Sequence, residues 1–409
     1  MKKIKINFTF EDICAWSIVL SCILLQYKTA IFSYGMLLLL TLTLINIFIH
    51  KKLYIDIKLI ILWLGIFFQQ MISLILFKLD FAIFIKNLFS ILLIIIITSI
   101  SHAIVDKDSF FYKYRNFAIF CTLIIIAQSF VVYVLKKPIN AILLLPQSDS
   151  SNWVEQSLRP MSLFTEPQTY CSFIFPAFLL CYKKKDYFGT FTIFLGIFLS
   201  GSSLGIMMIV FLGLITFFKS SISFFKKCLI FFGGIFSTVV IFLLPIFSFI
   251  KLKILSLFME FSLTNFQFKS TFSYTNYLRL IKGWVTFYEL PLKEKIVGLG
   301  LNNLTNYMEI TGTRFSWSKQ WAVNHIQNAY FNSSSGIFIE CGLVIGILYY
   351  YILIKKIKIE NSISKNILIF IIFQGFATQI FFNSIFIFWI LMYYIFSKNN
   401  FWEQEKEYL

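Results

Sequence analysis

The chain has 409 residues, of which 58% are hydrophobic and 13% are charged, and its formal net charge is +17. Soluble domains carry about 25% charged residues, so the composition excludes an ordinary soluble protein and predicts an integral membrane protein. The cations gather in short loops beside apolar segments, which is typical of cytoplasmic loops, so we expect no nucleic-acid partner.

Apolar segments follow one another along most of the chain, and a membrane-crossing helix needs about 20 such residues. The candidate spans lie at 12–27, 30–49, 59–77, 81–104, 117–135, 168–182, 187–200, 203–218, 228–250, 328–354, 366–381 and 383–397. The pair at 187–200 and 203–218 is short enough to be one broken helix instead. We therefore expect a single all-α polytopic membrane domain over residues 1–409, with about twelve transmembrane helices.

The distribution of lysine and arginine sets the expected orientation, because cytoplasmic loops are enriched in both. With a cytoplasmic N-terminus, nearly every inner loop carries three or more cations, whereas the short outer loops carry only Lys28 and Lys78. Both termini are then cytoplasmic. Two long polar loops, 136–167 and 251–327, face the other side, and we expect short helices in the second.

The first long loop ends with Arg159 and Glu166, each next to a proline, just before an apolar segment. Proline is common in the first turn of a helix, and an acid there interacts favourably with the helix dipole. Glu166 therefore has a structural explanation beside a functional one. Arg159 has no comparable structural requirement, and we take both as candidate catalytic residues.

The second long loop contains a predicted amphipathic helix with Asn276, Tyr277, Arg279, Lys282 and Trp284. Arg279 and Lys282 are three residues apart and share a face. Guanidinium and ammonium groups both bind pyrophosphate oxygens, although the same face would also suit lipid headgroups or water. Arg279 is a candidate catalytic residue, and Lys282, Asn276 and Tyr277 are candidate substrate-binding residues.

The end of this loop places His325, Asn328 and Tyr330 at the lip of the next apolar segment. An interfacial histidine can act as a general base near neutral pH, or it can simply be hydrogen-bonded there. We take His325 as a candidate catalytic residue and Asn328 and Tyr330 as candidate substrate-binding residues. Glu340 follows inside the apolar segment, where a carboxylate is a functional candidate by default.

Three further patterns have simple structural interpretations. The seven cysteines lie in or beside apolar segments without CxxC spacing, so we expect neither a metal site nor a disulfide framework. The sequence GSSLG at 201–205 fits a serine-hydrolase pattern, but that pattern needs a strand before it, and here it predicts a helix break. Gly298 and Gly300 lack a full phosphate-binding fingerprint and predict a tight backbone bend.

In their order along the chain, these segments resemble the O-antigen polymerase and O-antigen ligase superfamily of bacterial envelope enzymes. The resemblance is carried by Arg159 to Pro167, by the break SGSSLG, by Arg279 to Trp284 with the following Gly298-Leu299-Gly300, and by 325–330 with the following 340–346. Two positions depart from the pattern. Leu204 stands where members often have arginine, and Gln327 stands where they often have the histidine before the asparagine.

The resemblance implies a polymerase that joins oligosaccharide units linked through pyrophosphate to an undecaprenyl carrier, at the periplasmic face of the bacterial inner membrane. Arg159, Arg279 and Lys282 would stabilise the leaving pyrophosphate. His325 or Glu166 would position or deprotonate the acceptor hydroxyl. No cofactor or metal is expected; membrane lipid is an expected partner, and a chain-length regulator is a partner expected from the family.

Two alternatives remain. An O-antigen ligase, which moves finished polysaccharide onto lipid A-core, is disfavoured by the displaced histidine. A flippase for lipid-linked oligosaccharides belongs to a different class of protein. Flippases have a similar number of spans, but they usually lack a long outer loop and line a central cavity with charged residues.

Overall fold

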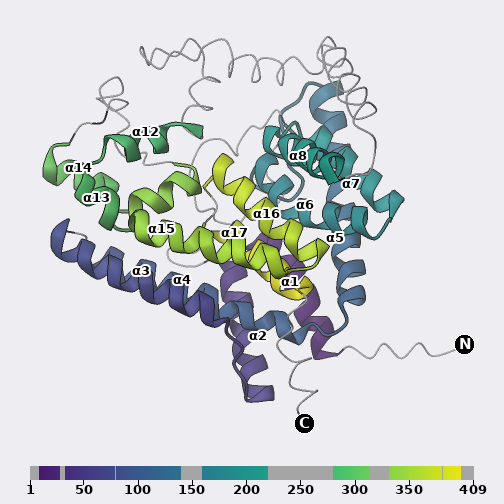
Figure 1. Ribbon diagram of the computed structural model, residues 1–409. Helices are drawn as coiled ribbons and strands as arrows, with labels where there is room; N and C mark the ends of the chain where they lie inside the picture. Colours follow the sequence, from purple (N-terminus) through teal and green to yellow (C-terminus); the bar gives the residue numbers. More distant parts are fainter. Residues whose placement is uncertain are drawn as a thin grey trace, which may run out of the picture.

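The computed structural model describes residues 9–27, 33–78, 80–139, 159–219, 280–313, 315, 331–379 and 381–397, and every regular element in them is helical (Figure 1). The helices are α1 (Phe10–Leu24), α2 (Tyr34–His50), α3 (Ile57–Leu76), α4 (Phe81–Thr98), η1 (Ser99–Ala103), α5 (Lys107–Ser129), η2 (Phe130–Val134), α6 (Pro167–Lys183), α7 (Tyr187–Leu199), α8 (Ser203–Lys219), α12 (Lys282–Glu289), α13 (Leu292–Val297), α14 (Leu304–Thr311), α15 (Ser333–Ile359), α16 (Ser362–Ala377) and α17 (Ser384–Phe396).

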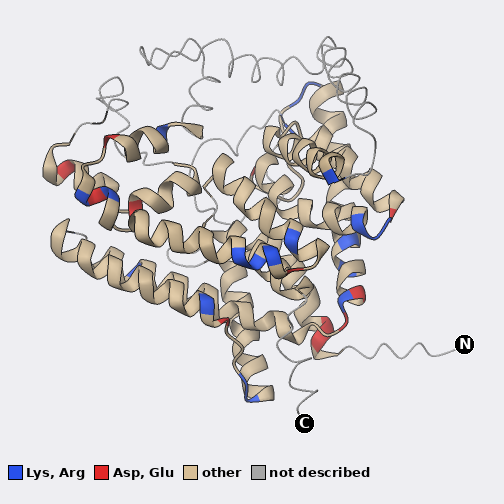
Figure 2. Ribbon diagram, in the orientation of Figure 1, with Lys and Arg blue, Asp and Glu red and all other residues tan. Residues whose placement is uncertain are grey.

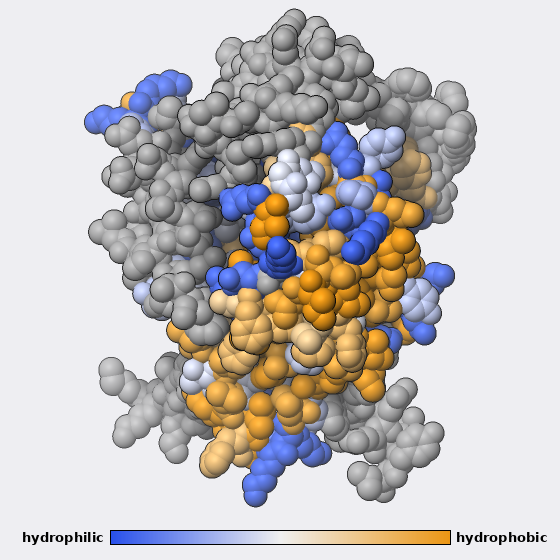
Figure 3. All heavy atoms as spheres, turned by 90° about the vertical axis from the view of Figure 1, so that its left-hand side faces the viewer, coloured by the Kyte–Doolittle hydropathy of each residue, from blue (hydrophilic) through white to orange (hydrophobic). Residues whose placement is uncertain are grey.

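Among the described residues, four helical stretches are long and apolar enough to cross a membrane. They are Ile57–Leu76, Phe81–Ala103, Lys107–Val134 and Ser333–Ile359. The shorter apolar helices α2, α7, α8, α16 and α17 pack among them. Figure 3 shows a hydrophobic belt across one face of the molecule, with hydrophilic residues above and below it. The prediction of an all-α membrane protein is confirmed at this level.

Capping side chains determine where several of these helices begin. The Asp56 carboxylate accepts the Lys58 N–H (2.9 Å) at the start of α3, and Asp80 accepts the Ile83 N–H (3.0 Å) at the start of α4. Such caps satisfy backbone donors that have no partner within the helix. Asp106 caps α5 in the same way, so α5 begins at Lys107, ten residues before the apolar segment expected at 117–135.

Helix α6 forms the centre of the bundle and is buried on nearly all sides (Figure 1). The helices around it are α5, α7, α8, α16 and α17. The Trp389 Nε1–H of α17 donates to the Ser172 carbonyl (2.8 Å), and the Phe175 ring of α6 packs on Phe370 of α16 (4.7 Å between centroids). A helix that is apolar all round belongs in such an interior position.

One end of the bundle holds all four ion pairs between described residues, and we call it the ion-pair end. The pairs are Lys113–Asp12, Arg115–Asp186, Lys184–Asp108 and Lys356–Asp56. Figure 2 shows acidic and basic positions close together where α1 and α5 begin. The residues come from segments that the sequence predicts to be cytoplasmic.

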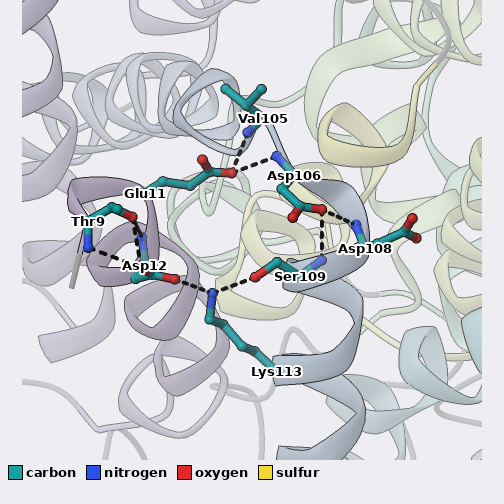
Figure 4. A network of polar contacts seen from close by, with 8 residues as sticks. All are labelled: Thr9, Glu11, Asp12, Val105, Asp106, Asp108, Ser109 and Lys113. Atoms are coloured by element: carbon teal, nitrogen blue, oxygen red, sulfur yellow. Dashed lines mark hydrogen bonds and ion pairs between the residues drawn. The ribbon is translucent and has the colours of Figure 1, made fainter. Parts of the chain in front are cut away.

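Figure 4 shows how the starts of α1 and α5 are joined at this end. The Glu11 carboxylate of α1 accepts the N–H groups of Val105 (2.8 Å) and Asp106 (2.6 Å), just before α5. The Lys113 ammonium of α5 bonds to Asp12 of α1 at 2.6 Å. Two consecutive backbone donors and one ammonium therefore bind adjacent carboxylates, and these contacts fix the two helix starts together.

Candidate functional site

The opposite end of the bundle carries the segment 159–166 and the start of α6. Pro167 occupies the first position of α6, and Glu166 is its N-cap residue with extended backbone angles (φ −148°, ψ 153°). The Glu166 side chain is exposed and makes no capping hydrogen bond. The carboxylate therefore contributes to this helix start only through the dipole, and it is accessible to solvent.

Two glutamine side chains hold the backbone of this segment in place. The Gln128 Oε1 of α5 accepts the N–H groups of Met161 (2.9 Å) and Ser162 (2.6 Å). The Gln26 Oε1, just after α1, accepts the Thr165 N–H (2.7 Å). Because buried backbone donors need partners, these bonds define one conformation for the turn between Arg159 and α6.

The same segment lies beside the break between α7 and α8. Arg159 is half-buried, and its charge acts on Tyr133, whose hydroxyl donates to the Leu199 carbonyl (3.0 Å) at the end of α7. Gly201 follows with φ 63°, in the left-handed region. Arg159 and the small-residue break, which are more than forty positions apart, therefore belong to the same end of the fold.

Helices α7 and α8 are two antiparallel helices and not one broken helix. Gly196 of α7 packs against Tyr170, and Gly205 of α8 packs against Cys171, so both helices contact the start of α6. A strand before GSSLG is not present, and the helix break expected there is confirmed. The serine-hydrolase interpretation therefore lacks its structural context.

Helix α12 lies across the start of α15, and its first residue is Lys282. The Asn332 Nδ2–H at the start of α15 donates to the Leu280 carbonyl (3.3 Å). Gly283 lies so close to Ser335 that a Cβ atom would overlap the serine hydroxyl. Lys282 is only 2% exposed, with its ammonium 5.5 Å from the centre of the Phe331 ring. Lys282 is therefore buried and does not lie on an exposed helix face.

Desolvation lowers the pKa of Lys282 to about 8. The unfolded chain, with a lysine pKa of about 10.4, binds more protons between these two values, so the folded state gains stability as the pH rises. We expect the free energy of unfolding to increase by up to about 3 kcal/mol between about pH 8 and pH 10. Thermal unfolding in detergent measures this, and Lys282→Met should remove the increase. An equal pH dependence in both proteins would contradict the assignment.

The loop 298–302, which we call the insertion loop, places its backbone in a break of α15. Gly342 has φ 76° and ψ 171°, so the helix loses its regular hydrogen bonds around this residue. The Leu299 N–H donates to the Ile339 carbonyl (2.9 Å), and the Gly300 N–H donates to the Glu340 carbonyl (2.8 Å). The insertion loop thus supplies the N–H donors that the broken helix lacks. These donors are needed because a buried backbone carbonyl without a hydrogen bond is costly.

Polar side chains of α3 bind the insertion loop from the other side. The Gln69 Nε2–H donates to the Glu340 carbonyl (3.0 Å), and the Ser73 hydroxyl donates to the Gly298 carbonyl (2.9 Å). The Gln70 Oε1 accepts the Leu301 N–H (2.9 Å). Three polar residues inside a membrane-length helix are thereby satisfied by the backbone of a distant loop.

The insertion loop also reaches the Glu340 carboxylate, whose Oε1 accepts the Asn302 N–H at 3.1 Å. Glu340 is half-buried, and its role in the described residues is to join the loop to α15. The sequence signals for this arrangement are Gly298, Gly300 and Gly342, all of which have positive φ. The hydrogen bonds from α3 to this arrangement have no signal in the sequence.

The described residues include three of the nine predicted site residues. Arg159, Glu166 and Lys282 all lie on segments at the end opposite the ion pairs. The other six lie outside the described residues: Asn276, Tyr277, Arg279, His325, Asn328 and Tyr330. Within the described ranges, no three histidine, cysteine, aspartate or glutamate side chains group as a metal site would need.

Comparison with known proteins found no match to this chain among family models, curated proteins or solved structures.

Proposed function

We propose that the protein is a membrane-embedded glycosyltransferase that polymerises oligosaccharide units carried on undecaprenyl pyrophosphate. The observation that carries the proposal is the common location of three separate segments. The start of α6 with Arg159 and Glu166, helix α12 with Lys282, and the start of α15 lie at one end of the bundle. These segments belong to the resemblance to the polymerase and ligase superfamily, and their order along the chain supports it.

The proposed reaction transfers a glycan from its lipid carrier to a sugar hydroxyl. The acceptor oxygen forms a bond to the anomeric carbon of the donor, the bond to the carrier pyrophosphate breaks, and the hydroxyl proton passes to a base. Arg159 would stabilise the charge that develops on the pyrophosphate. Glu166, exposed and free of a capping bond, would accept the proton, and His325 is the other candidate for this role.

The proposal includes an orientation of the protein in the membrane. We call the end opposite the ion pairs, where α6 begins and α16 ends, the site end. About twelve transmembrane helices would place the ion-pair end in the cytoplasm, because its cations follow the positive-inside rule. The site end would then lie at the periplasmic face of the inner membrane. Donor and acceptor are both anchored in that membrane by their polyprenyl chains. Such a reaction needs no nucleotide sugar, which is consistent with a site on the periplasmic side.

The test uses a strain that lacks the gene and a lipopolysaccharide gel. Wild-type protein should restore a ladder of chain lengths, and Arg159→Ala should reduce polymer formation by about 100-fold or more, to core plus a single unit. Lys137→Ala is the matched control, since Lys137 is an exposed cation in the same predicted loop, and it should restore the full ladder.

Each other pattern on the gel has a distinct meaning. A full ladder from Arg159→Ala would exclude the proposed role of this arginine. Bare core in the deletion strain, with long polymer on its carrier, would mean a ligase. Bare core without any carrier-linked polymer would mean a flippase.

A further inference from the structure

Four buried polar side chains at the site end have atoms that form no hydrogen bond. Among the described residues, the Ser172 hydroxyl, the Tyr349 hydroxyl, the Thr378 hydroxyl and both amide atoms of Gln374 are in this state. All four residues are at most 2% exposed. More than nine in ten buried polar groups in proteins have a partner, so these atoms are expected to bind either ordered water or a ligand. We call these four residues the orphan polar cluster.

The spacing around one contact between α6 and α16 indicates that Ser172 and Gln374 lie on facing sides of the two helices. Phe175 and Phe370 pack together with their ring centroids 4.7 Å apart. Ser172 lies three residues before Phe175, and Gln374 lies four residues after Phe370, so each shares a face with its aromatic neighbour. Helix α6 begins at the site end and α16 ends there. Ser172 and Gln374 therefore each lie about one turn closer to the site end than Phe175 and Phe370.

Three members of the cluster lie close to helix ends, whereas Tyr349 lies within α15. Thr378 is four residues beyond Gln374, and its carbonyl accepts the Ser333 N–H (2.9 Å) at the start of α15. Gln374 is three residues from the last residue of α16, and Ser172 is five residues from the first of α6. At 1.5 Å per residue, these depths are about 5 to 8 Å.

Phe381, in the turn between α16 and α17, packs beside two parts of the cluster. A Cβ atom on Gly375 would lie 2.6 Å from the Phe381 ring, next to Gln374 in the chain. The Phe381 ring also packs on the Tyr349 ring, with centroids 4.8 Å apart. This side chain belongs to a turn and not to a helix, so its displacement would open the cluster towards the site end.

We propose that the orphan polar cluster is a binding subsite for the hydroxyl groups of a neutral sugar ring. An amide and three hydroxyls offer both donors and acceptors, as the neighbouring hydroxyls of a sugar do. None of the four side chains carries a charge, so a phosphate or an ammonium group would be buried without compensation. The rings of Phe175, Phe370 and Trp389 provide apolar surface beside the polar groups, which is usual in ligand sites.

This inference rests on the proposed function, in which the ring bound here belongs to the acceptor unit. The subsite lies beneath the segment with Arg159 and Glu166, on the same helix α6. A sugar held by Gln374 and Ser172 would bring its neighbouring residue towards the exposed Glu166 carboxylate. The cluster would then select the acceptor by the pattern of its hydroxyl groups, and the arginine would act on the donor.

The experiment uses Gln374→Leu, which removes the orphan amide at nearly constant volume. Thermal unfolding of the purified full-length protein is followed with glucose, galactose and N-acetylglucosamine as probes, and chain length is followed on the gel in complemented cells. We expect at least one sugar to raise the melting temperature of the wild type. In Gln374→Leu the apparent affinity should fall about tenfold, as expected when about 1.4 kcal/mol is lost, and the ladder should shorten.

The melting temperature without sugar separates binding from a structural role. Gln374→Leu should leave the melting temperature of the sugar-free protein unchanged or raise it, because the buried amide forms no hydrogen bond there and its replacement loses none. Asn366→Leu is the control, since Asn366 lies two turns away on the same helix and its Oδ1 is also buried and unpaired. It should keep the sugar response and the full ladder.

Three outcomes would overturn the subsite. They are a wild type that responds to none of the three sugars, a Gln374→Leu protein with unchanged sugar affinity and ladder, and an equal loss in Asn366→Leu. An unchanged Gln374→Leu would mean that water alone satisfies the cluster. The proposed function fails separately, when Arg159→Ala or the deletion strain leaves the ladder intact, and a lost subsite with a working polymerase is therefore a distinguishable result.

Discussion

Gly342→Ala is expected to destabilise the protein by about 3 kcal/mol or more, through backbone strain and steric overlap. Gly342 has φ 76°, which disfavours any residue with a Cβ atom. The added atom would also overlap the carbonyl groups of Ile296 and Val297, which are backbone and cannot rotate away. The insertion loop would have to leave the break in α15, and thermal unfolding in detergent should show a large fall in melting temperature.

Gly336→Ala is the matched control because it lies in the same helix with regular geometry. A Cβ atom there would meet nothing within 4 Å. Alanine is a better helix former than glycine, so this variant should be as stable as the wild type or more stable by about 0.5–1 kcal/mol. If Gly342→Ala and Gly336→Ala unfold at the same temperature, the break in α15 does not depend on glycine.

Lys356→Ala is expected to cost about 3–5 kcal/mol, since it would leave a buried carboxylate without its cation. The side chains of Lys356 and Asp56 are only 8% and 9% exposed, and the two groups form an ion pair between the end of α15 and the start of α3. The Tyr394 hydroxyl of α17 donates to the same carboxylate (2.9 Å). Loss of the lysine would therefore loosen three helices at once, and denaturant titration in detergent measures the change.

Lys355→Ala is the control for this prediction, because Lys355 is the exposed neighbour of Lys356 and should be neutral. The double variant Asp56→Asn with Lys356→Met should recover most of the lost stability, since it buries no unpaired charge and the asparagine can still cap α3. A double variant as unstable as Lys356→Ala would contradict the explanation.

The same pair should make the protein sensitive to acid. Burial alone would raise the pKa of the Asp56 carboxyl, but the Lys356 ammonium and the hydrogen bonds to the carboxylate lower it below its ordinary value. A carboxyl with a lowered pKa stabilises the folded state above its unfolded pKa of about 3.9, and this contribution is lost as the pH falls further.

Hydropathy was sufficient to predict where most helices lie. The segments expected at 187–200 and 203–218 correspond to α7 and α8 within one residue at each end, because both are uniformly apolar and end at a small-residue break. The expected span at 228–250 lies outside the described residues. The start of α5 was placed too late, since a polar first turn capped by Asp106 carries no hydropathy signal.

Long-range pairing could not be predicted from a single sequence. Gln69 and Gly298 are 229 residues apart, and Asp56 and Lys356 are 300 residues apart. The glycines at 298 and 300 indicated a bend, but nothing in the sequence showed that the bend enters a break in another helix. The burial of Lys282 was missed for a similar reason, because the aromatic ring beside it comes from Phe331, in a different segment.

The sequence predicted some residues of the candidate site but not the orphan polar cluster. Arg159 and Glu166 are candidates because both stand next to prolines before an apolar segment, and their catalytic roles stay a prediction. The orphan polar cluster had no signal, because serine, threonine and glutamine inside apolar helices are common. Only the structure shows that these side-chain atoms are buried without partners, and only the packing of Phe175 on Phe370 brings the helices of Ser172 and Gln374 together.

The insertion loop also constrains the order in which the chain can be assembled. Gln69, Gln70 and Ser73 enter the membrane with α3, but the backbone groups that bind them are synthesised about 230 residues later. At about 5–20 residues per second, translation takes roughly 10 to 50 s to reach them. During that interval α3 carries polar side chains whose final partners do not yet exist. The first half of the protein therefore cannot reach its final packing until the second half has been inserted.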